Sequence, residues 1–264
     1  TFGVFHQLRE KGDILGILGK ASTGAKFYAD GEFENLRGRS ELVTFLQRPE
    51  RVFASVKASE LCPVNKESSK VGFDYYVVDD SNAERVILSN RMWTGSVRPP
   101  AKLHDLMRER LDRNPLWRYI VREKPKGIKH PLKVNYDNKI ELIGVDLPDA
   151  VDRGEHFEVT LYYHVLKPIT RNWQVFVHFD GVGGRFQGDH FPIKKRCGTN
   201  YWQVGDYIID RFTIESSNMG VANHSYKVWT GLFVGSNGNW TNMEVVSPEP
   251  DDNNRVSIGT LKMN

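Results

Sequence analysis

The residues best suited to chemistry lie close together in the C-terminal half of the chain. His178 and Asp180 are two positions apart, and Asp189 and His190 follow a glycine-rich turn at 181–184. Side chains at i and i+2 of a strand share a face, so a hairpin here would bring these residues together. Carboxylates beside imidazoles could bind a metal ion or form an acid–base pair. We prefer the alternative of ordinary hydrogen bonding, because Asp and His are common in loops and at strand ends.

Two further aspartates belong to this polar cluster, Asp206 and Asp210. Asp210 interrupts an apolar alternation over 207–214, in which Ile208 and Phe212 share a face. A carboxylate in that phase is directed toward a core, where an unpaired polar group is costly. We therefore expect Asp210 to be buried and hydrogen-bonded rather than catalytic.

Tryptophan rings offer a second kind of chemistry, because a flat aromatic face can stack on the apolar C–H surface of a sugar. The C-terminal half contains Trp173, Trp202, Trp229 and Trp240. In a β-sandwich such side chains more often pack in the core. Trp240 has the context that favours binding, because it adjoins the loop-like sequence Asn237-Gly238-Asn239.

The sequence thus nominates five residues for a polar depression that contacts a sugar or a divalent ion: Asp180, Asp189, His190, Trp202 and Trp240. We assign no catalytic residue, because the sequence has no nucleophile elbow and no HExxH motif, and no Ser–His–Asp order can be singled out. We also assign no cofactor, because neither glycine-rich stretch forms a phosphate-binding motif that opens a helix. Whether a metal ion binds is left open.

A β-sandwich would position these residues. The stretch 156–180 contains two runs with strand period, separated by a connection at Pro168. Each run has one strongly apolar face, which needs a second sheet to cover it. We therefore expect residues 132–264 to form an antiparallel β-sandwich with almost no helix. Six side chains should be buried between its sheets: Phe157, Val159, Leu161, Val175, Val177 and Phe179.

The N-terminal part mixes helix and strand signals. Residues 1–97 combine short apolar runs with one helical spacing after Ser40, which predicts a small α/β domain. Residues 98–131 are rich in proline and cations, and we expect a linker that contains a short amphipathic helix at 103–111. The basic residues are typical of a solvated linker, and contact with lipid headgroups is the alternative.

Composition limits the partners and the setting. The net charge is only +3 and no dense basic run occurs, so nucleic acid is not an expected partner. No apolar run is long enough to span a membrane, and because the chain starts at Thr1 we expect a piece of a longer protein. Cys62 and Cys197 fall in different predicted domains, and we prefer two free thiols to an interdomain disulfide.

Part of the N-terminal domain resembles a known family. Residues 41–54, ELVTFLQRPERVFA, together with 75–79 and 86–91, resemble the soluble extracytoplasmic region of bacterial multi-spanning glycosyltransferases. These enzymes use lipid-linked sugars and are similar to protein mannosyltransferases and the aminoarabinose transferase of lipid A. The resemblance implies a periplasmic or other extracytoplasmic location, tethered to a membrane, and a sugar-transfer context.

The C-terminal half resembles the β-sandwich appended to some proteins of this kind. The matching segments include VFVH at 175–178, QGDH at 187–190 and WQVGD at 202–206. In that family the membrane-embedded part carries the catalytic acidic residue and the lipid-phosphate contacts. The resemblance therefore transfers no catalytic residue to this chain, and we expect no activity from the chain alone.

Our first interpretation is a non-catalytic periplasmic portion of a membrane glycosyltransferase that helps to recognise acceptor or sugar. Its expected partners are carbohydrate or glycolipid and the membrane part of the parent chain. The alternatives from other classes are a free-standing carbohydrate-binding or adhesion module and a structural subunit of a cell-envelope complex.

Overall fold

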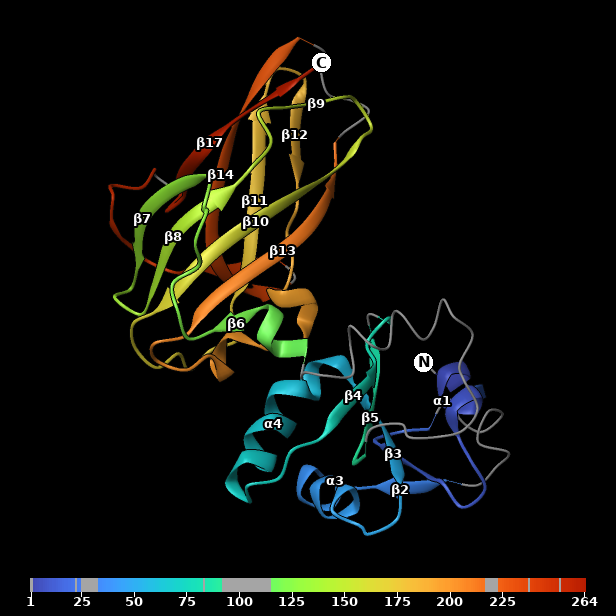
Figure 1. The fold of residues 1–264 in the computed structure, drawn as a ribbon. Coiled ribbons are helices and arrows are strands. Elements are labelled where there is room, and N and C mark those ends of the chain that lie inside the picture. Colours follow the sequence, from blue (N-terminus) through green and yellow to red (C-terminus); the bar gives the residue numbers. More distant parts are fainter. Residues whose placement is uncertain are drawn as a thin grey trace. The chain divides into compact units, whose positions relative to one another are not determined.

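The computed structural model describes residues 2–21, 23–24, 33–82, 84–91, 115–216, 223–236, 238–251 and 253–264. The chain divides into two compact units, residues 1–117 and 118–264 (Figure 1). The first combines helices with a mixed sheet, and the second contains two largely antiparallel sheets, which confirms the predicted fold class. The short helix expected at 103–111 lies outside the described residues.

The first unit is organised around one sheet. Its strands are β1 (Ile14–Leu18), β2 (Glu34–Leu36), β3 (Val52–Lys57), β4 (Tyr76–Asp79) and β5 (Arg85–Ser89). Their spatial order is β2-β1-β3-β5-β4. The first three run parallel to one another, whereas β5 is antiparallel to both β3 and β4. Short apolar runs rich in β-branched residues favour these strands.

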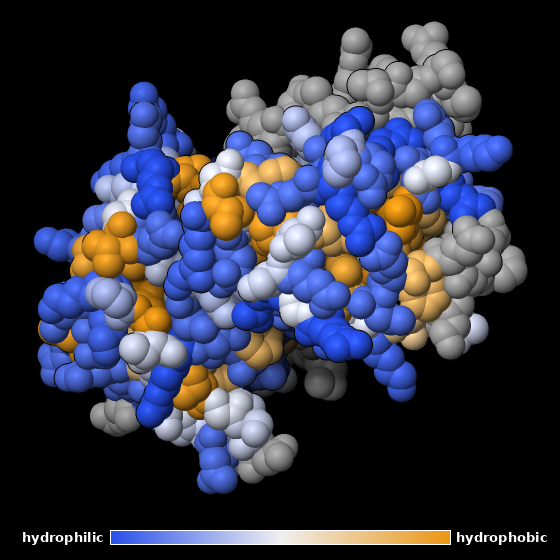
Figure 2. All heavy atoms as spheres, turned by 90° about the horizontal axis from the view of Figure 1, so that it is seen from below, coloured by the Kyte–Doolittle hydropathy of each residue, from blue (hydrophilic) through white to orange (hydrophobic). Residues whose placement is uncertain are grey.

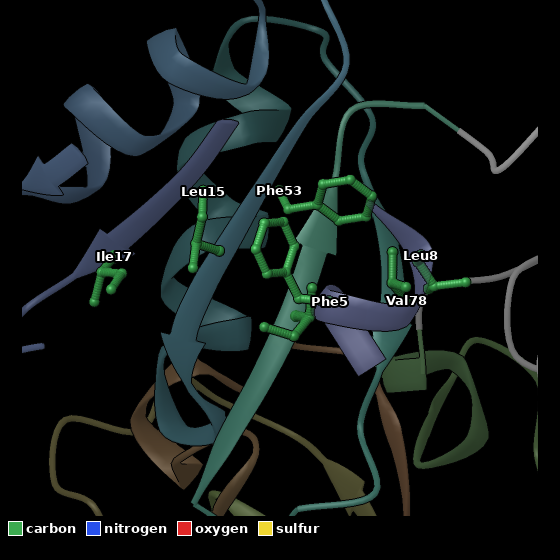
Figure 3. Packing of buried hydrophobic residues seen from close by; sticks show 7 residues of the cluster. Phe5, Leu8, Leu15, Ile17, Phe53 and Val78 are labelled. Atoms are coloured by element: carbon green, nitrogen blue, oxygen red, sulfur yellow. The ribbon is translucent and has the colours of Figure 1, made fainter. Parts of the chain in front are cut away.

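Helices pack on both faces of this sheet. They are α1 (Phe2–Leu8), α3 (Arg39–Leu46) and α4 (Leu61–Lys70), the last preceded by a 3₁₀ turn, η1 (Ala58–Glu60). Leu15 of β1 joins the cluster around α1, in which the rings of Phe5 and Phe53 meet edge-on at 5.3 Å (Figure 3). Strand alternation turns Gly16 to the other face, where an added Cβ would lie 2.8 Å from the ring of Phe45 on α3.

The second unit consists of two sheets. The first contains, in spatial order, β16 (Val245–Ser247), β7 (His130–Tyr136), β8 (Ile140–Asp146), β10 (His156–Val165), β13 (Tyr207–Glu215) and β6 (Ile120–Val121). The second contains β12 (Gly184–Gln187), β11 (Gln174–Gly181), β14 (His224–Ser236), β17 (Val256–Met263) and β9 (Ala150–Val151), and β15 (Asn239–Asn242) pairs with β14. Within the described part of 132–264 the helical segments are two 3₁₀ turns, η3 (Ile193–Lys195) and η4 (Thr199–Tyr201), as expected.

Two strands of the second unit begin inside the segment expected to be a linker, 98–131. β6 pairs with the start of β13, and β7 begins at His130. Pro131 sits where the pairing of β7 with β8 is irregular, next to a register shift that ends at Val134. A proline is tolerated at such a place in a sheet. The prolines of this segment favoured a linker in the sequence, but they are also compatible with this strand.

The core of the second unit lies between its two sheets. The six side chains expected there are each at most 7% exposed, which confirms the prediction. Phe157 of β10 meets Phe179 of β11 edge-on at 5.7 Å and 90°. Because β10 and β11 belong to different sheets, this contact joins the two layers of the sandwich.

The cysteines differ from the preferred expectation of two free thiols. Cys62 and Cys197 are both disulfide-bonded, so that expectation was wrong. Disulfide formation depends on the distance and direction of the Cα–Cβ vectors in the fold, which spacing along a chain does not reveal.

The surface carries mixed polarity. On the face drawn in Figure 2, hydrophobic side chains lie in small groups among hydrophilic ones. In the part of the chain that the structure describes, no helix is both long and apolar enough to cross a membrane.

Candidate binding pocket

The second unit has an open pocket of about 460 Å³ on its second sheet. A volume of this size lies within the range of about 300–1,000 Å³ that is usual for ligand sites. The pocket is lined by Phe176, His178, Arg185, Gln187, Asp189, Phe233, Trp240, Asn242, Asn253 and Arg255. These residues come from β11, β12, β14 and β15 and from the segments after β12 and before β17, so pairing between distant strands creates the site.

Strand alternation places the pocket residues of β11. Val175 and Val177 are buried in the core, so Phe176 and His178 occupy the outward phase. Phe176 pairs with Gly231 of β14, where an added Cβ would lie 2.3 Å from Cζ of the ring. The missing side chain of Gly231 therefore lets the Phe176 ring lie against the sheet. The His178 ring stacks on it with centroids 4.9 Å apart.

Three aromatic side chains, Phe176, Phe233 and Trp240, form what we call the aromatic row. The ring centroids of Phe176 and Phe233 are 6.1 Å apart, and those of Phe233 and Trp240 are 5.3 Å apart. Trp240 reaches this position because β15 folds back on β14 and pairs it with Gly235. Its side chain is 55% exposed, so much of the indole surface is available to a ligand.

Asp189 and His178 form a polar pair beside the aromatic row. Asp189 Oδ1 lies 3.3 Å from His178 Nε2 and accepts a hydrogen bond from the Val177 N–H, also at 3.3 Å. The β11–β12 hairpin creates this contact, because it sets His178 opposite Gln187, two residues before Asp189. The hairpin expected from the sequence is therefore present, and it brings this histidine and this carboxylate together.

Asp180 lies outside the pocket lining but holds the two arginines that line it. Arg185 donates Nε to Oδ1 of Asp180 at 2.5 Å and Nη2 to Oδ2 at 3.0 Å. Arg255 donates Nη1 to Asp180 Oδ2 at 2.9 Å and Nε to Asp251 Oδ2 at 2.8 Å. Partial burial raises the pKa of Asp180, but the hydrogen bonds and charges of the two arginines outweigh it and hold that pKa below its usual value.

His190 and Asp210 form a second pair, away from the pocket lining. The backbone of His190 pairs with Val175 of the second sheet, and its Nε2 lies 2.9 Å from Oδ2 of Asp210 in the first sheet. Its Nδ1 lies 2.7 Å from the carbonyl oxygen of Gly188. Both nitrogens can donate only in the imidazolium form. Burial lowers the pKa of His190, but the hydrogen bond and charge of Asp210 outweigh this and raise it above its ordinary value.

Asp210 itself has the environment expected from the sequence. It is 0% exposed, and its other oxygen accepts a hydrogen bond from the Ile193 N–H at 2.7 Å. The prediction of a buried, hydrogen-bonded carboxylate is confirmed. Together with His190 it forms a buried ion pair that joins the two sheets.

The four tryptophans of the second unit have different environments. Trp173 and Trp202 are 8% and 3% exposed, and the Trp202 ring lies 5.9 Å from that of Tyr163. Trp229 lies under the guanidinium of Arg255, with 4.7 Å between the guanidinium carbon and the ring centroid. Of the four, Trp240 lines the pocket.

The five residues nominated from the sequence therefore divide into three groups. Asp189 and Trp240 line the pocket, and Asp180 supports it through the arginines. His190 and Trp202 lie elsewhere, one in the ion pair between the sheets and the other in the core.

Apart from His178, the sequence interpretation did not single out the remaining lining residues, notably Phe176, Phe233, Arg185 and Arg255. One signal was present, because Phe176 stands in the otherwise polar phase of its strand, with Gln174. An aromatic side chain in the polar phase of a strand needs neighbours that cover it, and here Phe176 is 4% exposed beneath other pocket residues.

The sequence left open whether a metal ion binds. Among the residues that the structure describes, no group of three or more His, Cys, Asp or Glu side chains is arranged to hold a metal ion.

Comparison with protein-family models and with curated proteins found no match to this chain. The resemblance to glycosyltransferases that use lipid-linked sugars therefore rests on the sequence segments described above. The geometry of the pocket has to carry the functional argument.

Proposed function

We propose that the second unit binds carbohydrate in this pocket. The observation that carries the proposal is the aromatic row, which ends in the exposed Trp240 and lies in a pocket whose other lining residues are polar. A sugar ring has apolar C–H faces and a rim of hydroxyl groups. The exposed indole of Trp240, supported by the buried rings of Phe233 and Phe176, suits the faces, and the polar lining suits the rim.

The polar lining offers both kinds of hydrogen-bonding group. Gln187, Asn242 and Asn253 carry amides, which donate through nitrogen and accept through oxygen. Asn242 donates its Nδ2 to the backbone oxygen of Asn253 at 2.9 Å, which ties β15 to the segment before β17. Hydroxyl groups also donate and accept, so amides are suitable partners for them.

The carboxylates favour binding over bond cleavage. Glycoside hydrolysis usually needs two carboxyl groups that flank the scissile bond. Asp189 is the one carboxylate among the described lining residues, and nearby Asp180 is engaged by two arginines. We therefore propose a recognition role without catalysis.

We further propose, from the sequence resemblance, that this unit serves a membrane glycosyltransferase by recognising acceptor or sugar. The disulfide-bonded state of Cys62 and Cys197 supports an extracytoplasmic setting, because disulfides persist in oxidising compartments. A free-standing carbohydrate-binding module would share the same pocket chemistry. The parent gene distinguishes the two, because hydrophobic spanning segments upstream of Thr1 are expected only for the first.

A sugar titration tests the binding proposal. The full chain is titrated with a panel of mono- and oligosaccharides, with tryptophan fluorescence and calorimetry as readouts. Trp240→Ala and Phe233→Ala should each weaken binding about tenfold, equivalent to about 1.4 kcal/mol of lost stacking. Val246→Ala, at a side chain that is 46% exposed and outside the pocket lining, is the control. A panel in which no sugar gives heat or a fluorescence change would refute the proposal.

A further inference from the structure

The two arginines that line the pocket have carboxylate partners outside the lining, whereas the lining carboxylate Asp189 has no arginine or lysine partner among the described residues. Arg185 and Arg255 share Asp180, and Arg255 also binds Asp251, with 2.7 Å between Nη2 and Oδ2. These two cations and two anions cancel. Asp189 is the remaining carboxylate, and it has no arginine or lysine partner among the described residues. Among the charged side chains that line the pocket, Asp189 is therefore the one that is not neutralised by an arginine or lysine of the described residues.

Asp189 is also only partly used as a hydrogen-bond acceptor. Its Oδ1 faces the Val177 N–H and His178 Nε2, whereas Oδ2 accepts no hydrogen bond from the residues that the structure describes. The side chain is 30% exposed, so a ligand can reach it. A sugar hydroxyl can donate to Oδ2 and form a charge-assisted hydrogen bond. A ligand carboxylate or phosphate has no such proton to give and would repel Asp189.

We propose that the pocket selects sugars without an acidic group, with Asp189 as the residue that sets this selection. The inference rests on the carbohydrate binding proposed above and adds the class of ligand. Arginine often recognises acidic sugars and phosphates, but here both guanidiniums already have carboxylate partners. An acidic ligand would have to compete with Asp180 for them while it approached Asp189.

Asp180 supports the selection by Asp189, because it pairs with the two arginines that could otherwise recognise an acidic ligand. Its carboxylate binds Nε and Nη2 of Arg185, whose side chain is 45% exposed. Asp180→Asn would leave Arg185 without its ion pair, while Arg255 would keep Asp251. The pocket would then present an unpaired guanidinium, which is the group that recognises a carboxylate. This variant should therefore gain affinity for acidic sugars.

The test compares matched ligands by isothermal titration of the full chain. Neutral hexose oligosaccharides are paired with their uronic-acid counterparts. The wild type should bind the neutral member at least about tenfold tighter, and its affinity should change less than about twofold with added salt, because no ion pair forms. Asp189→Asn should weaken neutral binding about tenfold, and Asp180→Asn should strengthen acidic binding by a similar factor. Glu158→Gln, at an exposed carboxylate of the other sheet, is the control.

The outcomes separate this inference from the proposed function. Tighter binding of the acidic member by the wild type, or affinities that Asp189→Asn leaves unchanged, would overturn the charge selection and retain carbohydrate binding. Binding of no sugar at all would overturn both. Thermal melting of each variant, followed by circular dichroism, shows that any loss of binding is not a loss of folding.

Discussion

Removal of the negative charge of Asp210 should destabilise the second unit strongly near pH 6. Asp210 is 0% exposed, and its two oxygens bind the His190 ring at 2.9 Å and the Ile193 N–H at 2.7 Å. Asp210→Asn keeps the size of the side chain but leaves the His190 imidazolium, 18% exposed, without its counter-charge. Breaking a buried ion pair in this way typically costs about 3–5 kcal/mol, and we expect a loss of that order in the free energy of unfolding.

The loss should shrink as the pH rises. The folded-state pKa of His190 lies above its unfolded value of about 6.5, because Asp210 outweighs the effect of burial. The stabilisation is therefore complete below about pH 6.5 and is lost as the pH rises through the folded-state pKa. Between these two pKa values, each pH unit should remove about 1.4 kcal/mol from the difference between wild type and variant.

Urea denaturation across about pH 5 to 9 measures this difference, and hydrogen exchange of the amides of β10 and β13 locates it in the second unit. Asp149→Asn, at an exposed carboxylate, is the matched control and should change the stability by less than about 0.5 kcal/mol. A difference between wild type and Asp210→Asn that stays constant over this pH range would refute the imidazolium–carboxylate pair.

Three other experiments test the core, the sheet face and the cysteines. Leu161→Ala should cost about 2–5 kcal/mol, and Glu158→Ala on the exposed face of the same strand less than about 0.5 kcal/mol; equal effects in urea would contradict the core assignment. Gly231→Ala should cost about 1–3 kcal/mol by displacing the Phe176 ring, and Phe176→Leu should relieve part of this; strictly additive effects would contradict the contact. Protein from an oxidising compartment, titrated after unfolding, should show free thiols only after reduction; thiols before reduction would contradict the disulfide-bonded state.

The strands of the sandwich could be predicted because their phase is encoded locally. Leu161 and Val177 are fully buried, and in each strand the side chains two positions away follow the same pattern. A shift by one residue would expose the whole apolar set, so alternation specifies which face meets the core. The same reasoning identified Asp210 as buried, because it occupies the apolar phase of β13.

The pocket could not be predicted in the same way, because it depends on pairings between distant strands. Phe176 meets Gly231 and approaches Phe233 only because β11 pairs with β14 in one register. Arg255 precedes β17 and meets Asp180 of β11, although β14 lies between these two strands in the sheet. Neither periodicity nor composition specifies such partners. The aromatic row and the ion pairs of Arg185 and Arg255 with Asp180 could therefore be identified only in the fold.

The position of His190 away from the pocket lining has a local cause. The sequence hypothesis grouped Asp189 and His190 in one depression because carboxylates, an imidazole and an aromatic residue occur together around glycine-rich turns. In an extended segment, however, adjacent side chains point in opposite directions. Asp189 accordingly faces His178 in the pocket, while His190 turns toward Asp210 between the sheets. Adjacent residues on extended backbone are thus poor candidates for one site, and residues two apart are better ones.

Because the side chains of Asp189 and His190 point in opposite directions, the segment 188–190 contributes to both the pocket and the core. The Gly188 N–H donates to the Val177 oxygen at 2.8 Å, and His190 exchanges two backbone hydrogen bonds with Val175, each 2.9 Å. The backbone on both sides of Asp189 is therefore fixed to β11, and the His190 side chain adds an anchor in the first sheet. Asp189 therefore presents its free oxygen to the pocket from a backbone that is held to β11 on one side and, through His190, to the first sheet on the other.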